Sequence, residues 1–152
     1  VWAYNNTAKD DLFMVDPCIH YGWRDYSMRS SFGTFQEWLK TGWLYSGDQE
    51  ILNEGLERAN LYPVGEIIES AAKLYHPSVT YKKICGKARE FYYLSDATLV
   101  SKIVDQYNIQ YVVMINSEAN KYGAIPDWPV AFKNGFYTVI YPPVEEAFRE
   151  KP

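Results

Sequence analysis

The chain has 152 residues, of which 47% are hydrophobic and 22% are charged, as in a globular protein with a sizeable core. Its net charge of −4 argues against nucleic acid as a partner, because phosphates require a basic face, and it offers no polybasic membrane anchor. No stretch approaches the roughly 18 to 20 apolar residues that cross a bilayer, and no signal peptide is recognisable. Because the sequence begins with Val1, we expect it to be a piece of a longer protein.

The first predicted strand is the apolar run Leu12–Asp16, which Pro17 ends. Residues 2–11 before it indicate a short helix or turn and then a polar loop. A dense loop over 18–26 follows, and the moderate alternation of residues 26–32 predicts a second, weaker strand.

Helices are predicted next, because apolar residues recur at three- and four-residue spacing around 35–39, 48–60, 64–75 and 84–92. The clearest helix follows the capping pair Ser95-Asp96 and extends to Tyr107, where Asn108 is suited to a left-handed end.

A β-branched strand, 111–115, follows that helix at once. Residues 116–129 read as a loop containing glycine and proline. Asn134-Gly135 then indicates a turn before a last strand over 136–141.

This order of elements predicts an α/β fold with a small, mostly parallel sheet of about four strands, flanked by helices in a three-layer, Rossmann-like arrangement. We expect strands 12–16 and 111–115 to lie in one sheet. One domain is predicted over 1–143, and the charged residues 144–152 form a tail.

The loop after the first strand holds the densest group of polar and aromatic side chains, at the sheet edge where α/β proteins leave a crevice. Arginine binds anions through two hydrogen bonds, and aromatic rings stack on ring-shaped ligands. The predicted ligand-binding residues are His20, Tyr21, Trp23, Arg24, Asp25 and Arg29. The alternative is a structural loop, in which the arginines pair with nearby acidic residues and the tryptophan plugs the core.

No catalytic residue, metal site or cofactor is predicted. Asp16 and His20 are too few for a metal site, and we expect Asp16 to cap the loop after its strand. Cys18 and Cys85 permit one disulfide in an oxidising compartment, but we expect two buried or half-buried thiols. Asn5-Asn6-Thr7 fits the glycosylation pattern with Asn5 as the acceptor, which matters only in a glycosylating compartment.

Four segments together resemble the domain that follows the membrane helices of C-type glycosyltransferase-fold proteins. They are the opening Trp2 to Val15, in which Ala8 replaces the usual proline, the loop His20 to Arg29, the unit Leu94 to Ile115 and the closing Phe132 to Pro142. In oligosaccharyltransferases the equivalent loop carries Trp-Trp-Asp-Tyr-Gly. In this sequence only Tyr21-Gly22 matches and the Trp-Trp-Asp part is absent, so the resemblance does not imply that this chain recognises an acceptor peptide.

The resemblance implies an extracytoplasmic domain of a polytopic membrane protein, on the periplasmic or cell-surface side, that positions an acceptor or ligand or supports the membrane part. Its partners would be membrane helices of the same polypeptide and a glycan, lipid-linked sugar or peptide acceptor. The catalytic carboxylates and metal of such proteins lie outside this stretch, so it would be inert alone while the parent is a glycosyltransferase. The alternatives are a small free-standing enzyme that acts on a sugar or phosphate substrate, and a protein-interaction module.

Overall fold

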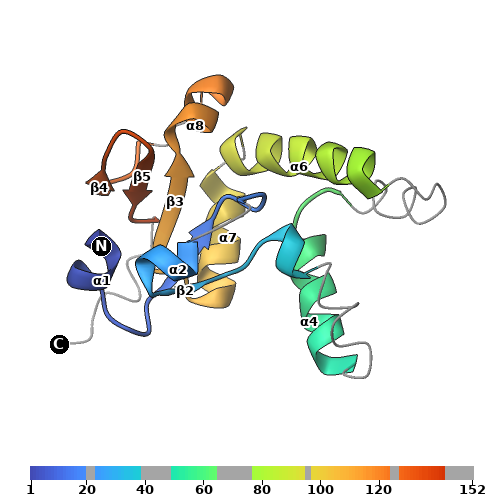
Figure 1. Cartoon of the computed structure of the whole chain (residues 1–152), viewed down its shortest axis with the longest axis horizontal. Helices are drawn as coiled ribbons and strands as arrows, with labels where there is room; N and C mark the ends of the chain where they lie inside the picture. The colour runs from blue at the N-terminus through green and yellow to red at the C-terminus, as the bar shows by residue number, and fades with distance from the viewer. Residues whose placement is uncertain (20–22, 39–48, 65–76, 95–96, 124–126, 143–152) are drawn as a thin grey trace. The chain divides into compact units, whose positions relative to one another are not determined.

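The computed structural model describes residues 1–19, 23–38, 49–64, 77–94, 97–123 and 127–142. The chain forms two compact units (Figure 1). Unit 1 comprises residues 1–16, 21–32 and 93–152, and unit 2 comprises residues 17–20 and 33–92. The predicted helix over 64–75 and the predicted tail over 144–152 fall almost entirely outside the described residues.

Unit 1 is built on a five-stranded sheet in the order β2-β1-β3-β5-β4. Its strands are β1 (Leu12–Val15), β2 (Ser30–Ser31), β3 (Tyr111–Ile115), β4 (Val130–Lys133) and β5 (Tyr137–Ile140). Strand β1 lies between β2 and β3 and runs parallel to both, whereas β5 runs antiparallel to both β3 and β4. The α/β class and the pairing of the first strand with strand 111–115 are therefore confirmed.

The predicted mostly parallel sheet of about four strands is wrong in its second half. The connection from β4 to β5 is a hairpin, which makes the pair antiparallel. The Asn134 side chain fixes this turn, because its Oδ1 accepts the backbone N–H groups of Phe136 and Tyr137 at 2.8 and 2.7 Å. The mixed sheet is thus not Rossmann-like in the strict sense.

A tight connection leads from helix α7 (Ala97–Tyr107) into β3. Asn108 takes the expected left-handed conformation, with φ of 50°, and the N–H of Ile109 donates to the carbonyl of Val104 at 2.9 Å. The N–H of Gln110 then donates to the carbonyl of Leu12 at 3.0 Å, which begins the pairing of β3 with β1. This helix, turn and strand are confirmed, whereas the predicted capping pair Ser95-Asp96 lies outside the described residues.

Two predicted local structures differ from the observed ones. The expected strand over 26–32 is reduced to β2, because helix α2 (Trp23–Ser27) occupies the end of the predicted loop. The expected loop after β3 begins instead as helix α8 (Asn116–Tyr122), which ends at Gly123 with φ of 71°. Both helices are short, with five and seven residues, which leaves too few apolar positions for a periodic signal.

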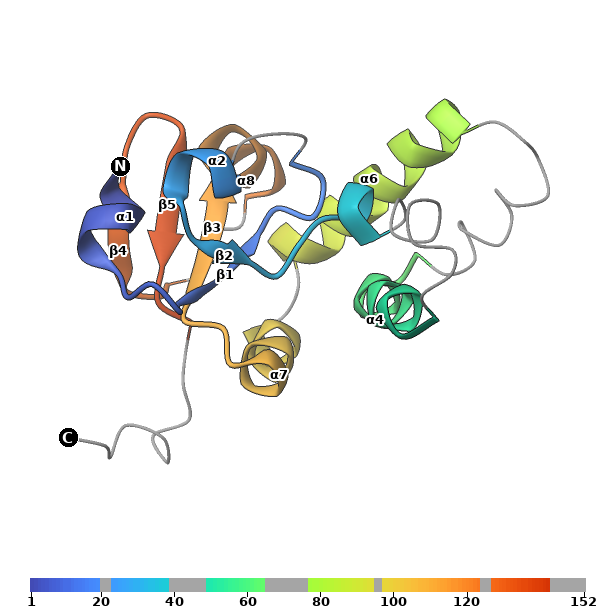
Figure 2. The same cartoon turned by 60° about the horizontal axis from the view of Figure 1, so that its bottom comes forward.

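The two faces of the sheet are covered by different helices of unit 1 (Figure 2). Trp2 of α1 (Trp2–Asn6) and Trp23 of α2 lie over one face, where they contact rings of β1 and β3. Tyr107 of α7 packs against Phe32 on the opposite face, with ring centroids 4.7 Å apart. The buried residues Val100, Ile103 and Val104 mark the side of α7 that faces the core.

Unit 2 contains α4 (Gln49–Asn60) and most of α6 (Pro77–Leu94), whose last two residues belong to unit 1. Its core is aromatic: Tyr62 contacts Phe35, Trp38 and Phe91 at centroid distances of 5.3, 5.9 and 5.5 Å. Gly55 allows a close approach here, because a Cβ at this position would lie only 3.0 Å from the backbone oxygen of Trp38.

Cys18 and Cys85 form a disulfide within unit 2, so the expectation of two thiols is wrong. The two residues are 67 positions apart in the sequence, but their Cα atoms lie 5.6 Å apart. The N–H of Phe35 donates to the carbonyl of Pro17 at 2.8 Å, and the guanidinium of Arg89 lies 3.5 Å from the carbonyl oxygen of Cys18. These contacts bring the chain after β1 to the side of α6.

Candidate ligand-binding surface

We use the name arginine loop for residues 20–29, which contain the predicted ligand-binding residues, and the structure describes only part of this loop. His20 and Tyr21 lie outside the described residues, as does the side chain of Asp25, although its backbone belongs to α2. The remaining predicted ligand-binding residues are Trp23, Arg24 and Arg29, and each of them makes a different contact.

Arg29 is 9% exposed and is bound on several sides by unit 1. Its Nε donates to Thr7 Oγ1 at 3.0 Å, its Nη1 donates to the Met28 carbonyl at 3.0 Å, and its Nη2 donates to the Tyr4 and Thr7 carbonyls at 2.6 and 2.8 Å. The guanidinium carbon also lies 5.3 Å from the centre of the Tyr4 ring. Arg29 therefore holds the end of α1, and four of its five N–H groups donate hydrogen bonds within the fold.

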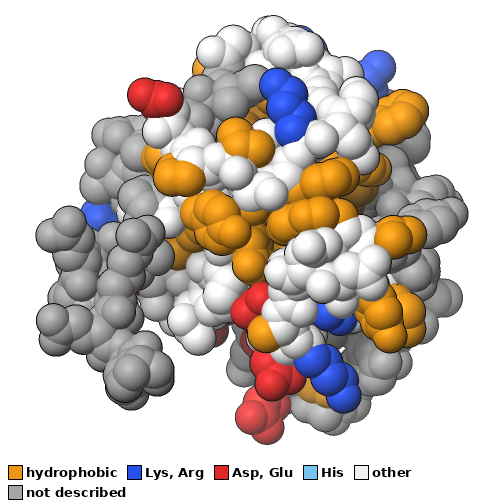
Figure 3. All heavy atoms as spheres, turned by 90° about the vertical axis from the view of Figure 1, so that its left-hand side faces the viewer, with side chains coloured by type: hydrophobic (Ala, Val, Ile, Leu, Met, Phe, Trp, Pro, Cys, Tyr) orange, Lys and Arg blue, Asp and Glu red, His pale blue; other side chains and the backbone are white. Residues whose placement is uncertain are grey.

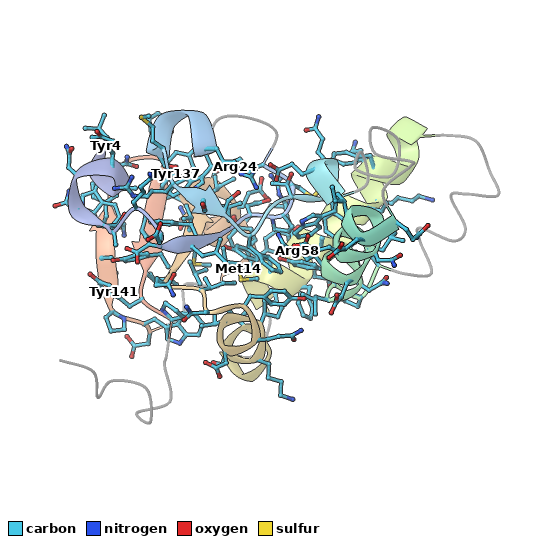
Figure 4. The ribbon with its side chains drawn as sticks, turned by 90° about the horizontal axis from the view of Figure 1, so that it is seen from below. Tyr4, Met14, Arg24, Arg58, Tyr137 and Tyr141 are labelled. Carbon is cyan, nitrogen blue, oxygen red and sulfur yellow. A yellow bond between two sulfur atoms is a disulfide. The ribbon has the colours of Figure 1, made fainter. Side chains whose placement is uncertain are left out.

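Arg24 is exposed on α2, and its Nε donates to Ser31 Oγ at 3.0 Å (Figure 4). Trp23 packs on Phe13, with ring centroids 5.1 Å apart. The part of the loop that the structure describes therefore binds neighbouring elements of unit 1.

Asp16 lies at the carboxyl end of β1 and is 1% exposed. Its Oδ2 accepts a hydrogen bond from the Tyr93 hydroxyl at 2.9 Å, and the Tyr93 oxygen in turn accepts the N–H of Ile115 at 3.2 Å. This chain of bonds joins the ends of β1, β3 and α6. Within the described ranges, no group of three or more His, Cys, Asp or Glu side chains is placed to hold a metal ion.

A row of aromatic rings crosses the face of the sheet that α1 and α2 cover. Phe132 stacks on Trp2 at 5.0 Å, Trp2 meets the Tyr111 ring edge-on at 6.1 Å, and Tyr111 stacks on Phe13 at 4.7 Å. Tyr141 contacts Tyr111 at 5.3 Å and is 41% exposed. The row therefore leads from the buried centre of the sheet to the surface of unit 1.

Several exposed apolar side chains surround the outer end of this row. Figure 3 shows hydrophobic side chains gathered on the side of unit 1 that carries α1 and the β4–β5 hairpin. In Figure 4, Tyr4, Tyr137 and Tyr141 all lie on this side of the ribbon. The strongly exposed apolar residues of unit 1 near these elements are Val1, Tyr4, Met28, Val130, Phe136 and Tyr141. We use the name aromatic surface for Trp2, Tyr4, Tyr111, Phe132 and Tyr141.

The phenol of Tyr111 gives the aromatic surface a polar group. Burial raises the pKa of Tyr111 above the ordinary tyrosine value, and the negative charge of Asp11 and the neighbouring Tyr141 raise this pKa further. Tyr111 is therefore neutral at physiological pH, and its hydroxyl group is hydrogen-bonded to Tyr141. Asp11 is itself held in place, because its Oδ2 accepts the N–H of Ala8 at 2.7 Å.

This pKa predicts a stability change in alkaline solution. Since the pKa is higher in the folded than in the unfolded chain, the contribution of Tyr111 is complete below about pH 10 and is lost as the pH rises through the folded pKa. We expect Tyr111→Phe to weaken the alkaline loss of stability, measured as denaturation midpoints at a series of pH values. Tyr4→Phe leaves the Tyr111 contacts in place and should keep the wild-type pH dependence. Identical alkaline profiles for wild type and Tyr111→Phe would contradict the assignment.

The sequence contains no local signal for the aromatic surface. Its five residues lie on α1, β3 and β4 and beside β5, at positions that the sheet alone brings together. The high aromatic content, 17% of the chain, was the only indication of such a surface in the sequence, and it does not show which rings lie on the same face of the sheet.

In the part of the chain that the structure describes, no helix has the length and apolar character needed to cross a membrane. Comparison with protein-family models, with curated proteins and with solved structures gave no match.

Proposed function

We propose that this chain is an extracytoplasmic domain of a polytopic membrane protein of the glycosyltransferase type, and that it positions an acceptor on its aromatic surface. The observation that carries the proposal is the aromatic row of unit 1, which ends at the exposed ring of Tyr141. Exposed aromatic side chains in contact with one another are typical of binding surfaces, whereas single exposed apolar residues are common on any protein.

The chemistry of this surface suits a ligand with both apolar and polar faces. Tyrosine and tryptophan rings provide flat apolar area, and their hydroxyl and N–H groups give hydrogen bonds. The hydroxyl of Tyr141, to which Tyr111 is hydrogen-bonded, adds a donor, and the nearby Asp11 carboxylate adds an acceptor. A sugar ring or an acceptor peptide has apolar and hydroxyl or amide groups that would match this pattern.

The disulfide supports the proposed compartment. Disulfides persist in oxidising surroundings such as the periplasm and the cell surface, and they are rare in reducing ones. Cys18–Cys85 therefore favours an extracytoplasmic location. The assignment to a membrane protein of the glycosyltransferase type rests on the sequence resemblance described above.

A thermal-shift screen tests the binding surface. The ligands are sugar phosphates, polyprenyl-phosphate analogues and short peptides, and the proteins are wild type and Tyr141→Ala. We expect a ligand of one of these classes to raise the Tm of the wild type, and this rise should be lost in Tyr141→Ala because the exposed ring of the row is removed.

Two variants are controls for this screen. Phe136→Ala removes an exposed ring, 76% accessible, from the hairpin turn at the far end of β5, and should keep the shift. Arg24→Ala tests the arginine loop and should also keep it. A shift lost in Arg24→Ala but kept in Tyr141→Ala would move the site to the loop, and no shift with any ligand on folded wild type would refute the proposal.

A further inference from the structure

Asn5 and Asn6 differ in what their side chains do, although they are neighbours on α1. The Nδ2 of Asn6 donates to the Trp2 carbonyl at 2.9 Å, which ties this amide to its own helix. Asn5 is exposed, and its side chain makes no hydrogen bond with the part of the chain that the structure describes. Both residues are exposed, but only the amide in the acceptor position of Asn5-Asn6-Thr7 makes no hydrogen bond with the described part of the chain.

Thr7, the third residue of this motif, is fully engaged in the folded state. Its Oγ1 donates to the Ala3 carbonyl at 2.7 Å and accepts a hydrogen bond from Arg29 Nε at 3.0 Å. Its carbonyl accepts a further bond from Arg29 Nη2 at 2.8 Å. Recognition of the motif requires the Asn5 amide and the Thr7 hydroxyl group. In the folded protein the hydroxyl group is already hydrogen-bonded to other residues.

We propose that Asn5 is an N-glycosylation site and that the glycan is attached before Arg29 docks onto the end of α1. The donor class is an oligosaccharide linked to a lipid diphosphate. The bond between the sugar C1 and the phosphate oxygen breaks, and a C1–N bond forms to Asn5 Nδ2. The amide loses one proton, and the lipid diphosphate leaves with the bonding electron pair.

The disulfide is independent support for a suitable compartment, since N-glycosylation and disulfide formation both belong to the secretory side of the membrane. The proposal shares only this compartment with the function proposed above. It does not depend on what the aromatic surface binds, so either proposal can fail alone.

The first test is the intact mass of the chain after secretion through a glycosylating pathway, before and after enzymatic removal of N-glycans. Wild type should carry one glycan that the enzyme removes. Asn5→Gln should carry none, and its exposed position predicts an unchanged Tm. Asn6→Gln is the matched control, because it changes the neighbouring amide but keeps Asn5 and Thr7, and it should be glycosylated. Thr7→Ser keeps the hydroxyl group and should also be glycosylated.

The second test addresses timing. A purified oligosaccharyltransferase with its lipid-linked donor is given either the folded, oxidised chain or the reduced and unfolded chain. We expect the unfolded chain to be modified at least tenfold faster. Secreted wild type without a glycan, with its disulfide formed, would overturn the site itself. Equal rates for the folded and unfolded chains would overturn the proposed order of events.

Discussion

Removal of the disulfide with the double change Cys18→Ala and Cys85→Ala should lower the free energy of unfolding of unit 2 by about 4 kcal/mol. The bridge joins residues 67 positions apart, so it closes a long loop and restricts the unfolded chain strongly. The two cysteines lie at separate places in the unit, one just after β1 and the other on α6. The loss would be measured by urea denaturation of the oxidised wild type and the double variant.

A reducing agent is the control for this experiment. It should destabilise wild type to nearly the same extent and leave the double variant unchanged, because alanine packs at both positions without a bond to break. If a reducing agent shifts the midpoints of wild type and the double variant equally, the bridge contributes nothing and the prediction is wrong.

Replacement of Arg29 by alanine should lower the free energy of unfolding by about 3 kcal/mol, because it leaves three backbone carbonyls without their charged donor. These are the carbonyls of Met28, Tyr4 and Thr7, two of which belong to the end of α1. The loss of stability should be largest at the end of α1. The α1 amides should therefore exchange hydrogen faster, before the amides of strands β1 and β3 do.

Two other substitutions separate geometry from charge. Arg29→Lys keeps the charge but loses the planar fork that reaches several acceptors, so we expect it to recover less than half of the lost stability. Arg24→Ala removes the hydrogen bonds of an exposed residue to Ser31 and should lower stability by only about 1 kcal/mol. A small effect of Arg29→Ala, similar to that of Arg24→Ala, would show that the buried bonds of Arg29 do not hold α1.

Local sequence determined those elements whose signals lie within a few residues. The helix ending at Tyr107, the left-handed Asn108 and strand β3 follow from capping, spacing and β-branched residues, and all are observed. The Asn134-Gly135 turn is likewise local, because one side chain satisfies two N–H groups of the turn. Strand β1 was recognisable because an interior strand covered on both faces of the sheet is apolar on both sides.

Tertiary structure decided the sheet direction and the short elements. Strand β2 has two residues and forms because it lies beside β1, where Ser31 pairs with Phe13. The antiparallel direction of β5 depends on β4, whose residues carry a weak pattern interrupted by an irregularity in pairing between Val130 and Phe132. Such pairing stabilises a strand that its own residues do not specify.

The candidate site shows the same division most clearly. The residue types in the arginine loop fit either a ligand site or a structural role. Arg29 has a structural role, because the structure places its guanidinium against the carbonyls at the end of α1. The disulfide and the aromatic surface join residues from distant parts of the chain, so no sequence window contains them. The sequence determines which side chains are present. The distance between side chains that are far apart in the sequence is fixed only when the sheet and helices pack, because two residues are in contact when their atoms are close in space.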